Sequence, residues 1–236
     1  AEQRKDSKQM YNYSMKKLAL FLLIISVFWH STSANADHVL SVDACYNIVK
    51  KQQLAINSEE WQQWRKNHKY SVSYVKVDNQ LIKIKASIAI DINVEGFLNI
   101  LHDVTSIPNW MPQAISADIK KLSTNHNVLS LQFAEIWPVG PRELVIESYI
   151  SHCAPYHFIK VLNVDRNASN PNIIKMQLIE GFWIIQQISP ESIHVNYVST
   201  VDPKGDIPQW IAQKVALRNI WQTLDNLNKL SKTNYN

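Results

Sequence analysis

Residues 197–230 read YVSTVDPKGDIPQWIAQKVALRNIWQTLDNLNKL and join an extended segment to a long helix through one short turn. Alternating apolar residues before the turn predict a half-buried β-strand. Pro203 fixes one backbone angle and Gly205 permits a positive one, so we expect the strand to end there. Asp206 can accept amide hydrogens of a following helix, and Pro208 suits a first helical turn. The stretch therefore predicts a strand, a tight turn and a C-terminal helix.

This C-terminal helix has an apolar stripe that carries two bulky indoles. Its members recur at the spacing of one helical face and are Trp210, Leu217, Trp221, Leu224 and Leu227. A terminal helix packed on a solid core explains such a stripe, and so does a helix that closes over a hollow sheet. The helix alone leaves both interpretations open.

Residues 15–36, MKKLALFLLIISVFWHSTSANA, have the organisation of a secretory signal peptide. Two lysines form a positive start, an apolar run follows, and small residues predict cleavage after Ala36. The apolar run is about half the ~20 residues that a membrane-spanning helix needs, which argues against an anchor. We therefore expect a soluble secreted or periplasmic protein. Residues 1–14 precede the signal peptide and are expected to be an upstream extension outside the fold.

Composition indicates one globular domain without a general affinity for nucleic acids. The chain has 236 residues, 46% of them hydrophobic, with 4 glycines and 9 prolines, which is typical of a single compact domain. It carries 24 basic and 20 acidic residues, a net charge of +4. Residues 1–36 hold five of the basic and two of the acidic residues, which leaves 19 against 18, or +1. This balance gives no electrostatic case for a nucleic-acid partner.

The chain has two cysteines, Cys45 and Cys153, and both follow the signal peptide. An oxidising compartment would allow them to form a disulfide. Two separate buried thiols that pack as small apolar side chains explain them equally well.

The first part of the mature chain is expected to be helical. Residues 43–56 and 58–67 read as two helical pieces, the second with Ser58 as its cap. We therefore divide the chain into an N-terminal helical segment over 37–57 and a main domain over 58–232.

The main domain predicts an α+β fold dominated by antiparallel strands. Two alternating segments at 70–77 and 81–91 predict a hairpin, and Asn93 is expected to cap a short helix. Further strands are expected at 116–122, 128–137, 143–153, 157–166, 173–185 and 193–201. Their connections are too short for parallel crossovers, so the sequence predicts a strongly curved antiparallel meander.

Common catalytic and cofactor motifs are absent from the sequence. It contains no G-x-S-x-G, H-E-x-x-H, C-x-x-C, G-x-G-x-x-G or phosphate-binding loop, and its histidines are scattered. We therefore predict no catalytic residue, no metal ligands and no cofactor.

Glu135 is the least ordinary polar residue of the predicted strands. It continues an alternation of apolar residues, Leu129, Leu131 and Phe133, that ends at Trp137. A carboxylate on such a face costs free energy unless it is paired, and Arg142 is an available partner. Glu135 is then either a polar anchor inside an apolar cavity or a charge at a strand end that reaches solvent.

Large aromatic residues are spread over the predicted sheet and its covering helix. They include Trp110, Trp137, Trp183, Trp210 and Trp221. Such residues commonly fill a core, and they are also what a site for a large apolar ligand presents.

Residues 58–230 resemble a StAR-related lipid-transfer (START) domain of the helix-grip superfamily. The resemblance is carried by four segments, LHDVTSIPNWMP, WPVGPRELV, GFWII and YVSTVDPKGDIPQW, of which the last is the most specific. The chain has Arg142-Glu143 where the family usually has Arg-Asp, and it lacks a proline that the family tends to have near Gln186 or Gln187.

The resemblance implies a curved antiparallel sheet around a long C-terminal helix, with an internal apolar cavity for one lipid or sterol-like molecule. The cavity candidates are Trp110, Phe133, Glu135, Trp137, Arg142, Trp183, Tyr197, Trp210, Leu217 and Trp221. Turns at Gly140 and Gly205 would let the helix open and close as a gate. We expect a monomer that contacts membranes transiently and needs no cofactor.

Three functions follow as hypotheses. The first is binding, with possible transfer, of a lipid or another hydrophobic ligand. The second is a cyclase or hydrolase that uses the same cavity, with Glu135 or a nearby histidine as acid or base. The third is a ligand sensor or partner-binding module.

Overall fold

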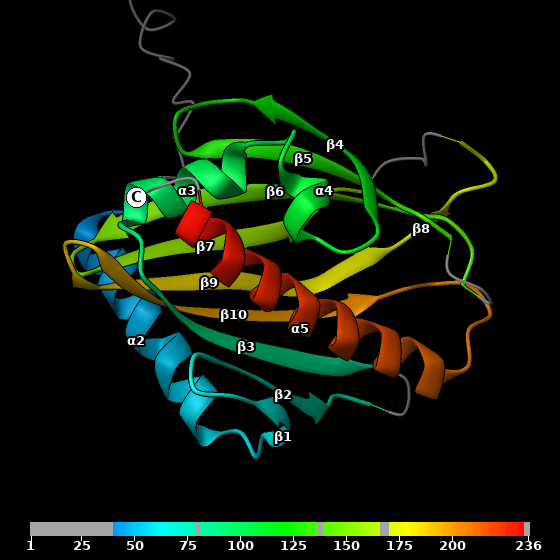
Figure 1. The fold of residues 1–236 in the computed structure, drawn as a ribbon, viewed down its shortest axis with the longest axis horizontal. Coiled ribbons are helices and arrows are strands. Elements are labelled where there is room, and N and C mark those ends of the chain that lie inside the picture. Colours follow the sequence, from blue (N-terminus) through cyan, green and yellow to red (C-terminus); the bar gives the residue numbers. More distant parts are fainter. Residues whose placement is uncertain (1–39, 79–80, 136–138, 166–169, 234–236) are drawn as a thin grey trace, which may run out of the picture. The chain divides into compact units, whose positions relative to one another are not determined.

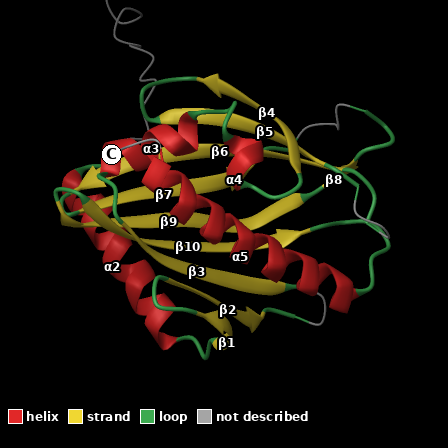
Figure 2. Ribbon diagram, viewed as in Figure 1, coloured by secondary structure: helices red, strands yellow, loops and turns green. Residues whose placement is uncertain are grey.

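The computed structural model describes residues 40–78, 81–135, 139–165 and 170–233. Over these residues one large curved sheet carries a long helix across one face and a shorter helix on the other (Figures 1 and 2). The predicted α+β class, with an antiparallel sheet around a C-terminal helix, is confirmed. The expected extension over 1–14 and the expected signal peptide over 15–36 lie outside the described residues.

The helices are α2 (Val42–Ser58), α3 (Val94–His102), α4 (Ile107–Trp110) and α5 (Gln209–Thr233). The strands are β1 (Gln62–Lys66), β2 (Tyr70–Lys76), β3 (Ile82–Ile90), β4 (Ala114–Lys121), β5 (His126–Phe133), β6 (Arg142–Cys153), β7 (Tyr156–Asn163), β8 (Ile174–Lys175), β9 (Gln177–Ser189) and β10 (Ser192–Asp202).

The sheet has the spatial order β1-β2-β3-β10-β9-β7-β6-β5-β4. Neighbours on this path are antiparallel, as the short connections predicted, and β10 returns to lie beside β3. The two-residue strand β8 departs from the expected pattern, because it pairs in parallel with the start of β6. The strand expected over 173–185 is therefore two strands, with Met176 between them.

The helix expected over 58–67 is wrong. Residues Gln62–Lys66 form the edge strand β1, which pairs with β2 with a register shift between Gln63 and Arg65. The unpaired edge of β2 offers backbone hydrogen bonds that outweigh a weak local preference for helix. The Trp64 ring packs at 6.2 Å from the Trp221 ring, which fixes this edge against α5.

The junction between β10 and α5 has the predicted turn. The Lys204 amide donates to the Asp202 carboxylate at 2.9 Å, and Lys204 and Gly205 have φ angles of 52° and 74°. A side chain at Gly205 would also meet Ile174 Cδ1 at 2.9 Å. The glycine is therefore required both by its backbone angle and by the close approach of β8.

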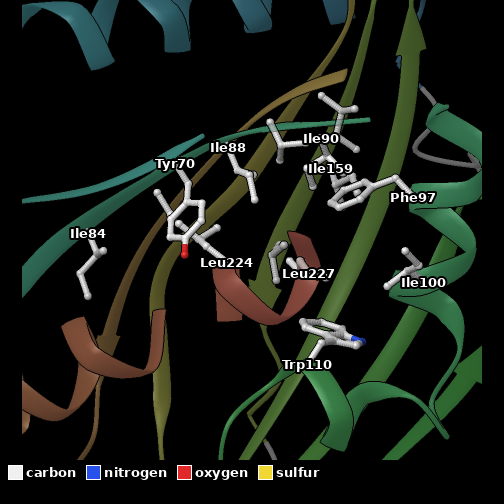
Figure 3. Close-up of a cluster of buried hydrophobic side chains, with 14 of the residues drawn as sticks. Tyr70, Ile84, Ile88, Ile90, Phe97, Ile100, Trp110, Ile159, Leu224 and Leu227 are labelled. Carbon is white, nitrogen blue, oxygen red and sulfur yellow. The ribbon is translucent and has the colours of Figure 1, made fainter. Parts of the chain in front are cut away.

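Two apolar clusters lie on opposite faces of the sheet. The larger one fills the face under α5, where Leu224 and Leu227 point toward side chains of β3, β7, α3 and α4 (Figure 3). The smaller one lies under α2 and includes Val49, Phe158 and Ile184.

A disulfide between Cys45 and Cys153 joins α2 to the end of β6. Of the two alternatives that the sequence left open, a disulfide or two free thiols, the structure has the disulfide. Among the described helices, none is long and apolar enough to cross a membrane.

Candidate functional site

A cavity of about 300 Å³ lies between the sheet and α5. Its walls come from most strands of the sheet and from the helices α3, α4 and α5, and nearly all of the side chains are aliphatic or aromatic. The volume is at the lower end of the range of about 300–1,000 Å³ for small-molecule pockets. Since protein interiors are normally close-packed, a void of this size under a covering helix is a candidate ligand site.

A smaller cavity of about 160 Å³ adjoins the large one at the start of α5. The residues that line both are Ile82, Phe133, Met176, Val201, Ala216 and Asn219. The smaller cavity is also lined by Gly140, Pro203 and Ile207, which belong to the two loops beside it. It therefore connects the large cavity to the loops that precede β6 and α5.

Arg142 holds these two loops together. Its guanidinium donates to the carbonyl oxygens of Pro203 and Lys204 at 3.2 Å each, and to the carbonyl oxygen of Gly140. The side chain is 5% exposed, and burial lowers the pKa of the guanidinium. Arg142 was a candidate for the cavity and an available partner of Glu135, and the structure places it at the smaller cavity with backbone partners.

The two predicted gate glycines differ. Gly205 takes a positive φ of 74°, and a β-carbon at this position would lie 3.5 Å from Arg142 Nη2. A β-carbon at Gly140 would meet nothing within 4 Å, and this residue has no positive φ. Only Gly205 is therefore required by the geometry of the loops.

Four of the predicted aromatic candidates line the large cavity, namely Trp110, Phe133, Trp183 and Tyr197. Trp183 and Tyr197 are direct neighbours on β9 and β10, with ring centroids 4.3 Å apart. The Tyr197 ring faces the cavity yet lies deep within the protein, and burial raises the pKa of its hydroxyl. Phe133, Trp183 and Tyr197 form an extended apolar wall on the sheet side of the cavity, and Trp110 of α4 adds an indole from the helical side.

Leu217 and Trp221 lie beside the cavity rather than in its wall. Leu217 is buried in the core, and the Trp221 ring packs on Tyr70 with centroids 4.7 Å apart. The helix face that lines the cavity consists of Ala216, Asn219, Ile220, Thr223 and Leu224. The predicted stripe is rotated from this face because α5 also packs against β2 and β3, which the periodicity of the helix does not reveal.

Trp210 and Glu135 lie in neither cavity. Trp210 is 68% exposed, because the first turn of α5 extends beyond the edge of the sheet where β3 begins (Figure 1). β5 ends at Phe133, so Glu135 follows the strand and is exposed to solvent. Of the two interpretations of Glu135, the structure agrees with a charge at the strand end that reaches solvent. Trp137 lies outside the described residues.

Most polar residues of the cavity were not predicted from the sequence. They are His102, Ser148, Tyr197, Ser199, Asn219 and Thr223, of which only Tyr197 was a candidate. Ser148 had a detectable signal, because it interrupts the apolar alternation of Leu144, Ile146 and Ile150 on β6. No sequence signal indicated His102, because its place in the cavity wall depends on how α3 packs over the sheet.

Metal binding has no support in the described part of the chain, where no group of three or more histidine, cysteine, aspartate or glutamate side chains could hold an ion. The described lining of the large cavity also contains no carboxylate. The arrangement can enclose an apolar molecule, and it offers few groups for acid–base chemistry.

The sequence and the fold match known proteins. A family model described as "START domain" matches residues 41–229. START domain-containing protein 10 of Mus musculus and of Homo sapiens is 26% identical over 147 residues, which cover 61% of this chain and 50% of each relative. The chain thus spans about half the length of these curated relatives.

Solved structures share the fold at lower identity. A crystal structure of human STARD10 has a TM-score of 0.68 and 20% identity, with 78% of each chain covered. A STAR-related lipid transfer protein fragment from Xanthomonas axonopodis has a TM-score of 0.67 and 18% identity, with 74% of this chain and 100% of that chain covered. The curved sheet and its C-terminal helix are therefore the helix-grip arrangement expected from the sequence.

Proposed function

The chain belongs to the START domain family, and from that premise we propose that it binds a lipid or another hydrophobic ligand in the large cavity and exchanges it with membranes. The observation that carries this proposal is the apolar void between the sheet and α5. A ligand that leaves water for such a void gains about 0.8 kcal/mol for each buried CH₂ group. Exchange rather than chemistry is then the function.

The proposed entrance is the smaller cavity at the N-terminal end of α5. It adjoins the ligand cavity and is bordered by the loops that Arg142 holds together. Separation of these loops would break the hydrogen bonds of one guanidinium and leave the sheet intact. This end of α5 and the turn at Gly205 would then act as the gate.

Trp210 gives the proposed entrance a contact with membranes. Its indole is 68% exposed and stands in the first turn of α5. Tryptophan favours the interface between lipid and water because its ring is apolar and its N–H is polar. We propose that a monomer docks transiently at this end when it takes up or releases its ligand.

Secretion to a periplasm or to the outside of the cell is the proposed localisation. The disulfide between Cys45 and Cys153 supports it, because structural disulfides persist mainly in oxidising compartments. Thiol labelling of the protein in freshly fractionated cells tests this. Both cysteines should resist labelling until a reductant is added, and the protein should be absent from the cytoplasmic fraction.

We propose further that the protein is not an enzyme. The cyclase or hydrolase hypothesis used Glu135 or a nearby histidine as acid or base, and Glu135 is exposed outside both cavities. The titratable side chains among the described lining of the large cavity are His102 and Tyr197. A Glu135→Gln variant is therefore expected to bind the same ligand as the wild type.

Native mass spectrometry tests the proposed function. The purified protein is measured before and after incubation with vesicles of phosphatidylethanolamine and phosphatidylglycerol that contain a total lipid extract. We expect a ligand-bound species in one or both spectra, and extraction should identify the ligand. A protein that carries no ligand and takes up none would contradict the proposal. A ligand that binds without transfer between vesicles would favour the sensor hypothesis.

A further inference from the structure

Polar side chains gather at the end of the cavity that is far from the proposed entrance. β6 begins with Arg142 at the entrance and reaches Ser148 six residues later. At about 3.3 Å per strand residue, Ser148 lies about 20 Å further along the sheet. The strand segment between them presents Leu144 and Ile146 to the cavity. A ligand that reaches Ser148 therefore spans a long apolar stretch.

His102, Asn127 and Ser148 belong to one polar cluster at this inner end. Asn127 and Ser148 are directly opposite each other on β5 and β6. The Asn127 amide nitrogen lies 3.5 Å from His102 Nε2, and Asn127 is only 2% exposed. His102 and Ser148 both face the cavity. The cluster combines hydrogen-bond donors and acceptors on the cavity wall.

The Ser148 hydroxyl has no hydrogen-bond partner in the described part of the protein, and neither does the buried Nε1–H of Trp110. In Figure 3 the indole nitrogen lies on the edge of the ring toward Ile100 of α3, the helix that ends at His102. Buried polar groups without partners are rare and costly. The Trp110 N–H is such a group, and the half-buried Ser148 hydroxyl stands open on the cavity wall, so both offer a hydrogen bond to a ligand group.

Some of the other polar groups of the cavity wall already have polar neighbours. Asn219 exchanges two hydrogen bonds with Gln113 at 3.0 and 3.2 Å. The Ser199 side chain acts on the Tyr197 hydroxyl and opposes the rise in its pKa that burial causes. Thr223 adds one more hydroxyl from α5. At the inner end of the cavity, the hydrogen-bonding capacity therefore lies with His102 and Ser148.

Charge distinguishes between classes of ligand. The described residues that line the large cavity include no aspartate, glutamate, lysine or arginine. Burial, and to a lesser degree the charge of Lys121, lowers the pKa of His102, which keeps the ring neutral near pH 7. The Arg142 guanidinium at the entrance already donates to three carbonyl oxygens. An ionised group at the inner end would therefore find no charged side chain to pair with in the described wall of the cavity.

We propose that the inner end of the cavity, formed by His102, Asn127 and Ser148, is a subsite for one uncharged oxygen group, a hydroxyl or a carbonyl, of an otherwise hydrophobic ligand. This inference rests on the proposed function and adds the class of ligand. A molecule that enters with an ionised end first is excluded, because that end would lose its hydration without gaining a charged partner.

Displacement of Nile red, an uncharged fluorescent probe, tests the subsite with four ten-carbon compounds at pH 7.5. They are 1-decanol, decanoate, decylammonium and 1-chlorodecane, which share one chain and differ in the terminal group. We expect 1-decanol to displace the probe at a concentration at least about tenfold lower than either ion, because neither ion finds a counter-charge.

Substitutions then assign the effect to the subsite. Ser148→Ala should reduce the preference for 1-decanol over 1-chlorodecane by about fivefold, the cost of one hydrogen bond. His102→Leu should act in the same direction. Ser199→Ala is the matched control, since it removes a hydroxyl from the wall of the same cavity on β10, outside the subsite, and should not reduce that preference. Unfolding midpoints close to that of the wild type show that each variant is folded.

The outcomes separate the subsite from the binding function. If the four compounds bind and Ser148→Ala leaves their ratios unchanged, the subsite is wrong and the cavity still binds hydrophobic ligands. If the two ions bind as well as 1-decanol, the exclusion of charged ends is wrong. If neither Nile red nor any of the four compounds binds to the folded wild type, the proposed function itself fails.

Discussion

The two ends of α5 are held in different ways. We call residues 217–230 the anchored half and residues 209–216 the entrance half. The anchored half contributes Leu217, Leu224 and Leu227 to the core, each at most 5% exposed. No residue of the entrance half is fully buried. One helix thus combines a fixed segment with a segment that can move without breaking the core.

The anchored half is also held by polar and aromatic contacts with β1 and β2. The Tyr70 hydroxyl donates to the Asp225 carboxylate at 2.8 Å, and the Trp221 ring contacts the rings of both Tyr70 and Trp64. The Arg65 guanidinium lies 5.0 Å from the centre of the Trp221 ring. The entrance half follows a turn in which the carbonyl oxygens of Pro203 and Lys204 accept hydrogen bonds from the Arg142 side chain. The sequence predicted that the whole helix opens and closes as a gate. We propose instead that only its first turns move.

Leu227→Ala should have the largest effect on stability. Leu227 is 1% exposed, and loss of a fully buried leucine side chain costs about 3 kcal/mol of unfolding free energy. Trp210→Ala is the comparison in the entrance half and should change the same quantity by less than about 0.5 kcal/mol. Denaturant unfolding measures both. Equal losses would show that the two halves are anchored alike.

Arg142→Lys should accelerate ligand release about tenfold. Lysine keeps the charge but cannot donate in a fork to the carbonyls of Pro203 and Lys204, so the closed entrance loses about 1.4 kcal/mol relative to the open one. Stopped-flow release of Nile red to excess vesicles measures the rate. Lys204→Gln, which removes only a surface pair with Asp202, is the control. An unchanged rate in Arg142→Lys would rule out these bonds as the latch.

Tyr70→Phe should destabilise the protein by about 1 kcal/mol without changing ligand release. Lys229 and then Tyr70 hold the pKa of Asp225 below its usual value. A lowered carboxylate pKa stabilises the fold above the unfolded pKa of about 3.9, and this contribution disappears as the pH falls through the folded pKa. The difference in unfolding free energy between wild type and Tyr70→Phe should thus be constant from about pH 5 to 8 and shrink below about pH 4.

The control for that measurement is Tyr74→Phe on the same strand. Its ring is partly buried against the core, and its hydroxyl makes no hydrogen bond to another described residue. Its unfolding free energy should show no such dependence on pH. If both variants follow the same curve, the contact between Tyr70 and Asp225 does not hold the anchored half.

Trp210→Ala should have the smallest effect, about a threefold slower transfer of ligand between vesicles with unchanged equilibrium binding. Ile188→Ala is the matched control, because Ile188 is 60% exposed at the opposite end of the sheet, beside the turn between β9 and β10 (Figure 1). A fluorescence-quenching transfer assay measures both. Equal slowing in the two variants would contradict docking at the entrance.

Local patterns predicted most of the fold. Alternating residues indicated most strands from β2 to β10, and Asn93 caps α3 through a 2.7 Å hydrogen bond from the Gly96 amide. The turn at Gly205 was readable because a positive φ and a helix start have clear residue preferences. The strand β1 was missed because its pairing with β2 depends on the sheet edge and not on its own residues.

The site was predicted less completely, for a physical reason. Trp183 and Tyr197 were found because alternation on a strand determines which face a side chain occupies. Trp210 was misplaced because the helical period does not show where the supporting sheet ends. His102 and Asn127 were missed because they meet only when α3 packs over β5. The part of the site that depends on contacts between distant segments therefore could not be predicted from local sequence patterns.

Hydrogen–deuterium exchange along α5, with and without 1-decanol in the cavity, tests the division between its halves most directly. Amides of residues 209–216 should exchange fast in the free protein and become protected by at least about tenfold when the ligand is bound, because the entrance then closes. Amides of residues 217–230 should exchange slowly in both states. Protection that is uniform along the helix, or no change in either half when the ligand is bound, would contradict an entrance at the N-terminal end of α5.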